Sequence, residues 1–99
     1  MSSSPDSIFE PVATTVSFSL GKLVVELSDG RDIAVPISWY PRLENASSIE
    51  LAEWELIGDG RGIHWESLDE DISVAGLISG RPSNESAASL QRWLSARDA

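Results

Sequence analysis

The feature that most constrains the fold is a pair of alternating apolar runs that meet at a glycine turn. Every second residue is apolar in 23–27 and again in 33–37, and Ser28, Asp29 and Gly30 lie between the two runs. A period of two is typical of strands that bury one face, and aspartate with glycine is typical of the tight turn between them. The stretch therefore predicts an antiparallel β-hairpin.

Whether the loop has two or three residues decides the register of this hairpin. A two-residue loop would set Val25 opposite Ala34 and would turn the two apolar sets to opposite faces of the sheet. A three-residue loop sets Val25 opposite Ile33, and Gly30 can take the left-handed conformation that such a loop needs. We predict the second register, with Pro36 on an outer strand or at a strand end because proline cannot donate to a ladder.

A third strand precedes the hairpin. Residues 12–20 alternate between apolar and hydroxyl side chains, which again indicates a half-buried strand. A glycine-first turn at residues 21–22 pairs Phe18 with Val25 and lets the apolar faces agree. The sequence thus predicts a three-stranded antiparallel meander over about residues 14–38.

The rest of the chain alternates short helical and strand patterns. Residues 47–53 have helical spacing, with Asn45 or Ser47 available as a cap. Apolar runs flank the glycine-rich segment 58–62, which we interpret as a hairpin turn and not a phosphate-binding loop because it leads into a strand. The predicted fold class is α+β: a three-stranded antiparallel meander plus a second short hairpin, packed with two or three short helices.

Three consecutive acidic residues, Asp69, Glu70 and Asp71, precede an apolar segment that begins at Ile72. We interpret this segment as a short helix that Asp71 caps, with the other two carboxylates near its positive end. Carboxylates in a row could also hold a hard cation, but an ion-binding loop spaces its oxygen ligands at alternate positions. The prediction for the triplet is therefore a structural role.

His64 is the only histidine, and the chain has no cysteine. It therefore lacks the usual companions of a zinc site or a catalytic pair. We predict a packing or surface histidine, no catalytic residue, no metal site and no cofactor. A metal-binding or hydrolytic role that combines His64 with Asp69, Glu70 or Asp71 is an alternative.

The C-terminal part predicts a linker followed by a helix. Residues 86–96 are helix-forming, with Ser83 or Asn84 available as a cap, and Leu90 and Trp93 belong to an apolar stripe. The stripe could pack on its own domain or on another chain. The predicted division is a flexible segment over 1–13, an α+β domain over 14–79, and a linker with the C-terminal helix over 80–99.

Composition limits the classes of function. The chain has 99 residues and a formal net charge of −9, so a nucleic acid would have to be approached against a repulsive field. No apolar run is long enough to cross a bilayer, and the amino terminus lacks the segments of a signal peptide. We expect a soluble cytoplasmic protein that binds neither membranes nor, directly, nucleic acids.

Two segments together resemble the consensus blocks of a known family, in the same order and at a similar separation. The first block is Asp29-Gly30-Arg31 followed by Ile33, Val35-Pro36 and Pro41-Arg42-Leu43, and the second is Ile63-His64-Trp65 followed by residues 68–74. The pair resembles domain-of-unknown-function family 2442, small proteins mainly of bacteria, over residues 16–78. Glu66 departs from this pattern, because the family often has proline at that point.

What the resemblance implies about function is limited, because the family has no established catalytic residues. Its members are often encoded beside another small protein in a pair that looks like a toxin and an antitoxin, and some relatives carry a helix-turn-helix region that this sequence lacks. We therefore expect an antitoxin-like, non-enzymatic protein-interaction module that binds the product of a neighbouring gene, such as a small basic toxin-like protein. The alternative is a transcription-linked regulator, and a homo-oligomer stays open.

The expected contact residues are aromatic and apolar. Tryptophan is enriched among the residues that dominate protein interfaces. Trp93 with Leu90 is therefore the first choice for a partner-binding anchor, and Trp39 with Tyr40 is the second.

Overall fold

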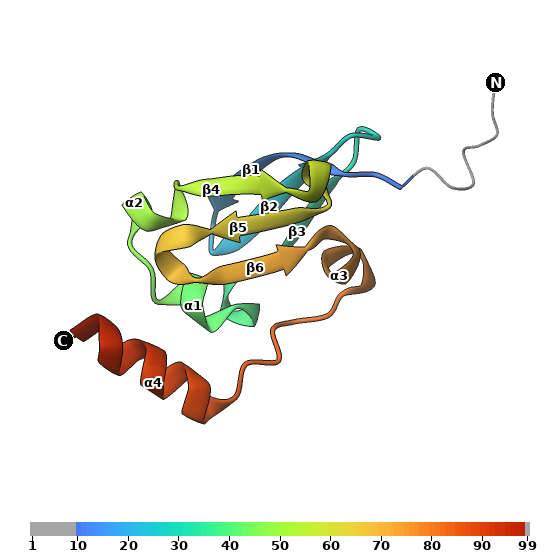
Figure 1. Cartoon of the computed structure of the whole chain (residues 1–99). Coiled ribbons are helices and arrows are strands. Elements are labelled where there is room, and N and C mark those ends of the chain that lie inside the picture. The colour runs from blue at the N-terminus through green and yellow to red at the C-terminus, as the bar shows by residue number, and fades with distance from the viewer. Residues whose placement is uncertain (1–9, 99) are drawn as a thin grey trace, which may run out of the picture.

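Two three-stranded antiparallel sheets form the body of the protein in the computed structural model, which describes residues 10–98 (Figure 1). The first sheet has the order β1-β2-β3 and the second the order β4-β5-β6. The strands are β1 (Ala13–Ser19), β2 (Lys22–Leu27), β3 (Asp32–Pro36), β4 (Trp54–Ile57), β5 (Gly62–Trp65) and β6 (Glu70–Ser73). The meander and the second hairpin are confirmed, and β6 extends that hairpin to a third strand.

Short helices connect the strands, and one longer helix follows them. The helices are η2 (Ile37–Trp39), α1 (Pro41–Glu44), α2 (Ser48–Leu51), η3 (Gly58–Gly60), η4 (Glu66–Leu68), α3 (Val74–Ser79) and α4 (Ala87–Asp98). The α+β fold class is therefore confirmed. In the described part of the chain, no helix is both long enough and apolar enough to span a membrane.

The predicted register of the β2–β3 hairpin is confirmed. Val25 lies opposite Ile33 and Leu23 opposite Val35, and Gly30 has a φ of 93°. Pro36 is the last residue of β3, which is an edge strand. The prediction required one assumption, that the apolar residues of both strands are buried on the same face of the sheet.

The predicted turn between β1 and β2 is wrong by one residue. Leu20 and Gly21 occupy the turn, with φ of 53° and 76°, so Phe18 lies opposite Leu23 and not opposite Val25. This displaces the strand pairing by two residues, which leaves every side chain on its predicted face. The unfavourable effect of this turn on stability is confined to Leu20, which is 97% exposed and takes a left-handed conformation.

The hydrophobic core lies between the two sheets. Its centre is Trp65 on β5, which is fully buried, contacts Phe18 of the first sheet with ring centroids 6.4 Å apart, and donates from Nε1 to the Leu51 carbonyl at 3.1 Å. The other fully buried large side chains are Leu23, Val25, Leu43, Ile63 and Leu68. Trp65 thus ties the second sheet to both the first sheet and α2.

The predicted helix cap at Asp71 is wrong. Residues 70–73 form β6, with Ile72 buried opposite Ile63 of β5, and helix α3 begins only at Val74. Its cap is Ser73, whose hydroxyl accepts from the Gly76 amide at 3.0 Å. Because residues 70–73 pair with β5 as a strand, the helix starts after the acidic triplet and not within it.

Two helix starts follow capping chemistry. Of the two candidates before α2, Ser47 is the cap, and it forms a capping box with Glu50. Before α4, the cap is neither Ser83 nor Asn84. The Ser86 hydroxyl accepts from the Ser89 amide at 3.1 Å, so the helix starts later than predicted.

Candidate functional site

The apolar stripe of α4 packs on its own domain. Trp93 is half-buried against the core cluster, and its Nε1 donates to the carbonyl of buried Leu68 at 3.0 Å. Leu90 is also half-buried. Of the two packing possibilities for this stripe, the structure has Trp93 on the domain's own surface.

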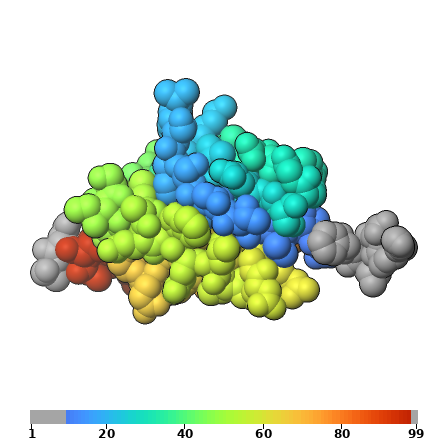
Figure 2. Space-filling view, turned by 90° about the horizontal axis from the view of Figure 1, so that it is seen from above, coloured from blue at the N-terminus to red at the C-terminus, as the bar shows by residue number. Residues whose placement is uncertain are grey.

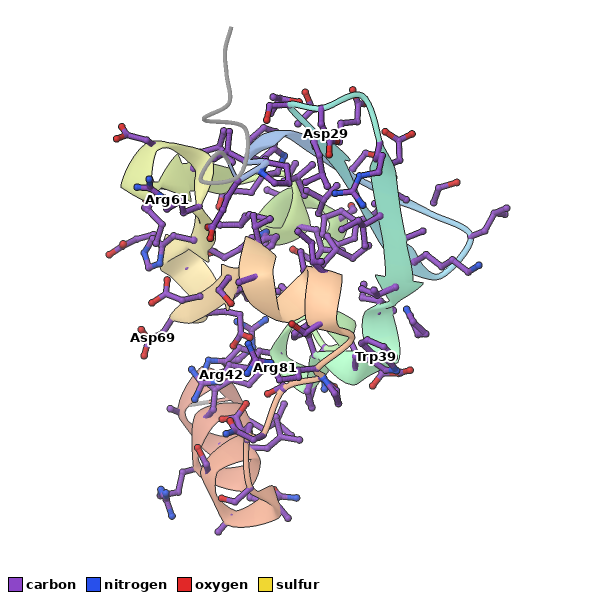
Figure 3. All side chains as sticks on the ribbon, turned by 90° about the vertical axis from the view of Figure 1, so that its right-hand side faces the viewer. Asp29, Trp39, Arg42, Arg61, Asp69 and Arg81 are labelled. Carbon is purple, nitrogen blue, oxygen red and sulfur yellow. The ribbon has the colours of Figure 1, made fainter. Side chains whose placement is uncertain are left out.

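An ion pair with little exposure holds the start of α4 to the body of the domain. Arg42 on α1 donates from Nη2 to Glu85 at 2.7 Å, and the two side chains are 15% and 9% exposed. The same guanidinium donates from Nη1 to the carbonyls of Leu68 at 3.3 Å and Asp69 at 2.9 Å. Figure 3 shows Arg42 at the junction between α4 and the sheets.

The second predicted pair, Trp39 and Tyr40, lies beside the linker that leads to α4. Tyr40 is 4% exposed, donates its hydroxyl to the Arg81 carbonyl at 3.3 Å, and has a pKa raised by burial. Trp39 is half-buried, and its carbonyl accepts from the Ser83 amide at 3.0 Å. These contacts fasten the linker to the domain.

The acidic triplet does not converge on one point. The side chain of Asp69 is 91% exposed, with one oxygen 3.7 Å from Arg42. The Asp71 side chain contacts His64 on the neighbouring strand, whereas Glu70 is only partly exposed and lines a cavity of about 300 Å³ together with Tyr40. Because successive residues of a strand point to opposite faces, Glu70 and Asp71 are directed away from each other on β6.

Glu70 is a carboxyl whose protonation depends strongly on the fold. Burial raises its pKa to about 7, and the nearby Arg42 guanidinium acts in the opposite direction. The Glu70 carboxyl therefore binds its proton more tightly in the folded chain than in the unfolded chain. The free energy of unfolding should fall as the pH rises from about 4.5 to about 7.

Glu70→Gln should remove this pH dependence. Above pH 7 the variant should be more stable than the wild type by on the order of 1 kcal/mol, because the buried carboxylate no longer has to be desolvated. Below about pH 4.5 the two proteins should have equal free energies of unfolding, because Glu70 is then protonated in both states. Urea unfolding at several pH values measures the difference, and a constant difference across the range would contradict the prediction.

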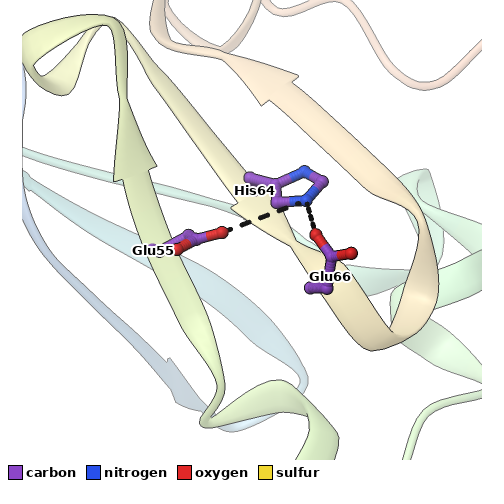
Figure 4. Close-up of side chains that lie close together, drawn as sticks. All are labelled: Glu55, His64 and Glu66. Carbon is purple, nitrogen blue, oxygen red and sulfur yellow. Dashed lines mark hydrogen bonds and ion pairs between the residues drawn. The ribbon is translucent and has the colours of Figure 1, made fainter.

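His64 lies at the centre of a carboxylate cluster on the outer face of the second sheet (Figure 4). Glu55 of β4 and Asp71 of β6 are its direct partners across the two strand pairs. Nδ1 of His64 donates to Asp71, and Nε2 lies 2.8 Å from Glu66 Oε1 and 4.0 Å from Glu55 Oε1. We call these four residues the His64 cluster.

The carboxylates of the His64 cluster stabilise a proton on the ring. Hydrogen bonds that the ring donates to Glu66 and Asp71 raise the pKa of His64 to about 9. Sequence reasoning considered Asp71 as a companion but missed Glu55 and Glu66. Glu66 is two residues after His64, so the period of a strand places the two side chains on the same face. The position of Glu55 next to His64 depends on the register between β4 and β5, which the sequence does not show.

An apolar groove lies between the edge strand β1 and helix α2. Its volume is about 280 Å³, and it is lined by Val16, Ser17, Phe18, Ser48, Leu51, Ala52 and Trp54. The turn that follows β1 and helix α2 carry the most exposed large apolar side chains of the described chain, Leu20 at 97% and Ile49 at 72%. Figure 2 shows the β1–β2 turn, in light blue, projecting from the surface. We call this region the β1–α2 groove.

Comparison with known protein families matches residues 13–83 to a family described as "Protein of unknown function (DUF2442)". The chain belongs to this family. The DUF2442 region includes both sheets, the β1–α2 groove and the His64 cluster, whereas α4 begins after it. No curated protein matches the chain.

Two solved structures resemble this DUF2442 chain. The crystal structure of a protein of unknown function from Rhodospirillum rubrum has 34% identity and a TM-score of 0.68, over 78% of this chain and 95% of that one. The solution NMR structure of an uncharacterised protein from Chromobacterium violaceum has 26% identity and a TM-score of 0.64, over 82% of this chain and 74% of that one. Both support the family fold.

Proposed function

We propose that this DUF2442 chain is a non-enzymatic, antitoxin-like interaction module that binds a small basic protein, the product of a neighbouring gene, in the β1–α2 groove. The observation that supports this proposal best is Leu20. It is 97% exposed and has a φ of 53°. Both properties are unfavourable for a leucine.

The conformation of Leu20 costs stability that another residue would save. A left-handed residue with a branched side chain costs about 1 kcal/mol, and turns of this kind favour asparagine, aspartate or glycine. An apolar side chain that is exposed to water adds no stability to the protein when no partner is bound. A residue that breaks two local rules without a compensating contact suggests a role outside the domain.

The surroundings of Leu20 suit a protein partner. β1 is an edge strand, and an edge can accept a further strand through its unpaired backbone groups. Phe18 and Trp54 are half-buried and line the groove, so a partner's apolar side chains would find aromatic contacts there. The net charge of −9 favours a basic partner and would speed its association at low salt.

Leu20→Asn tests this proposal because stability and binding should move in opposite directions. The free energy of unfolding should rise by about 1 kcal/mol, since asparagine tolerates the left-handed conformation. Affinity for the purified product of the neighbouring gene should fall about tenfold or more, because burial of a leucine side chain is lost. Urea unfolding and isothermal titration calorimetry measure the two quantities.

Ile78→Asn is the matched control, because Ile78 is 45% exposed and lies on α3, away from the groove. It should leave the affinity unchanged. If Leu20→Asn binds the partner as tightly as the wild type does, the groove is not the contact surface. Absence of any complex with the wild type would contradict the module itself.

A further inference from the structure

We propose that Glu55, His64 and Glu66 form a binding site for one divalent transition-metal ion of the Zn²⁺ class, with Asp71 orienting the histidine. The site lies on the outer face of the β4-β5-β6 sheet, which no helix of the described chain covers (Figure 1). It is separate from the β1–α2 groove. The inference therefore does not depend on the proposed function.

Convergence of three ligand atoms is the first observation. One carboxylate oxygen from Glu55, one from Glu66 and one imidazole nitrogen of His64 all lie within 4.8 Å of one another. Glu55 and His64 are directly paired residues of β4 and β5, so the sheet fixes the positions of their backbones. A site on rigid strands is positioned better than one on a loop.

The distances leave room for a metal after a small movement. Zinc bonds nitrogen and oxygen at about 2.0–2.2 Å, so two ligands of a tetrahedral ion stand about 3.3 Å apart. Nε2 of His64 lies 2.8 Å from Glu66 and 4.0 Å from Glu55, distances on either side of this value. The two glutamate side chains are 87% and 61% exposed, so both can rotate to the required distance.

Asp71 supplies the outer support that histidine ligands of metals usually have. A ligating histidine generally donates its second ring N–H to a carboxylate or carbonyl, which fixes the tautomer and the ring plane. Nδ1 of His64 donates to Asp71 from the opposite side of the ring, and this leaves Nε2 directed at Glu55 and Glu66. Binding of the ion would displace the proton from Nε2 to solvent.

The charge of the cluster favours a cation. In the described chain, no lysine or arginine pairs with Glu55, Glu66 or Asp71, so three carboxylates share one histidine. A donor set of one imidazole and two carboxylates suits zinc and similar ions, whereas Ca²⁺ and Mg²⁺ prefer oxygen ligands in larger number. Water would complete the coordination.

Titration of the full chain with Zn²⁺ at pH 7 by isothermal titration calorimetry tests the site. We expect one ion per chain and a melting temperature that rises with Zn²⁺ and returns to its initial value on addition of EDTA. His64→Gln should abolish binding, and Glu55→Gln and Glu66→Gln should each weaken it at least tenfold. Asp71→Asn should also weaken it, by about 10–100-fold, through the orientation of the ring.

Glu26→Gln is the matched control, because Glu26 is an exposed carboxylate on the other sheet. It should bind Zn²⁺ as the wild type does, and Mg²⁺ should not raise the melting temperature of the wild type. Wild type that binds no Zn²⁺ overturns the proposal. So does binding that survives the two glutamate substitutions, because the histidine alone would then hold the ion. Circular dichroism confirms that each variant is folded.

Discussion

Replacing Arg42 with alanine is expected to lower the free energy of unfolding by about 3 kcal/mol, because it leaves a buried carboxylate without its partner. The side chain of Glu85 is 9% exposed, and its carboxylate accepts from Nε and Nη2 of the Arg42 guanidinium at 2.7–3.0 Å. For a chain of this length, the loss corresponds to a fall in melting temperature of about 12 °C or more. Thermal unfolding followed by circular dichroism measures it.

Two comparisons show whether burial causes the loss. Arg31→Ala removes an arginine that is 60% exposed and pairs with Asp29, so it should cost less than about 1 kcal/mol. The double variant Arg42→Met with Glu85→Leu should recover much of the stability, since neither charge is then left unpaired. A loss of less than 1 kcal/mol in Arg42→Ala would contradict the assignment of this pair as a main support of α4.

The parts of the fold that sequence could predict are those decided by neighbours in the chain. The β2–β3 register follows from parity and one glycine, and the start of α2 follows from Ser47 and Glu50. The β1–β2 turn was misplaced because Leu20 adopts a conformation that its residue type disfavours. Local rules cannot anticipate a residue that violates them.

The candidate sites depend on longer-range pairing, which one sequence does not reveal. Residues 70–73 became a strand because Ile72 pairs with Ile63, and a run of four residues is too short for its period to distinguish strand from helix. Arg42 and Glu85 are 43 residues apart. Glu55 reaches His64 only through the β4–β5 register. In each case the residue types were visible and their proximity was not.

Alanine in place of Trp93 is expected to release helix α4 from the domain. The ring packs on the core, donates to the Leu68 carbonyl, and has the guanidinium groups of Arg42 and Arg97 5.3 and 4.5 Å from its centroid. A helix of 12 residues is marginal in water on its own, so it should unfold once it loses this contact. Hydrogen exchange of the α4 amides should then approach the rate of an unprotected chain, while the amides of β2 stay protected.

Trp39→Ala is the matched control for this loss of protection, because Trp39 is another half-buried tryptophan that lies outside α4. It should lower the overall stability but leave the α4 amides protected. A further attachment of α4 is the ion pair of Arg97 with Glu50 at 2.8 Å, which lowers the pKa of Glu50 to about 2. If α4 stays protected in Trp93→Ala, this pair and the Arg42–Glu85 pair suffice to hold it. That result would contradict the prediction that the Trp93 ring is needed to hold the helix.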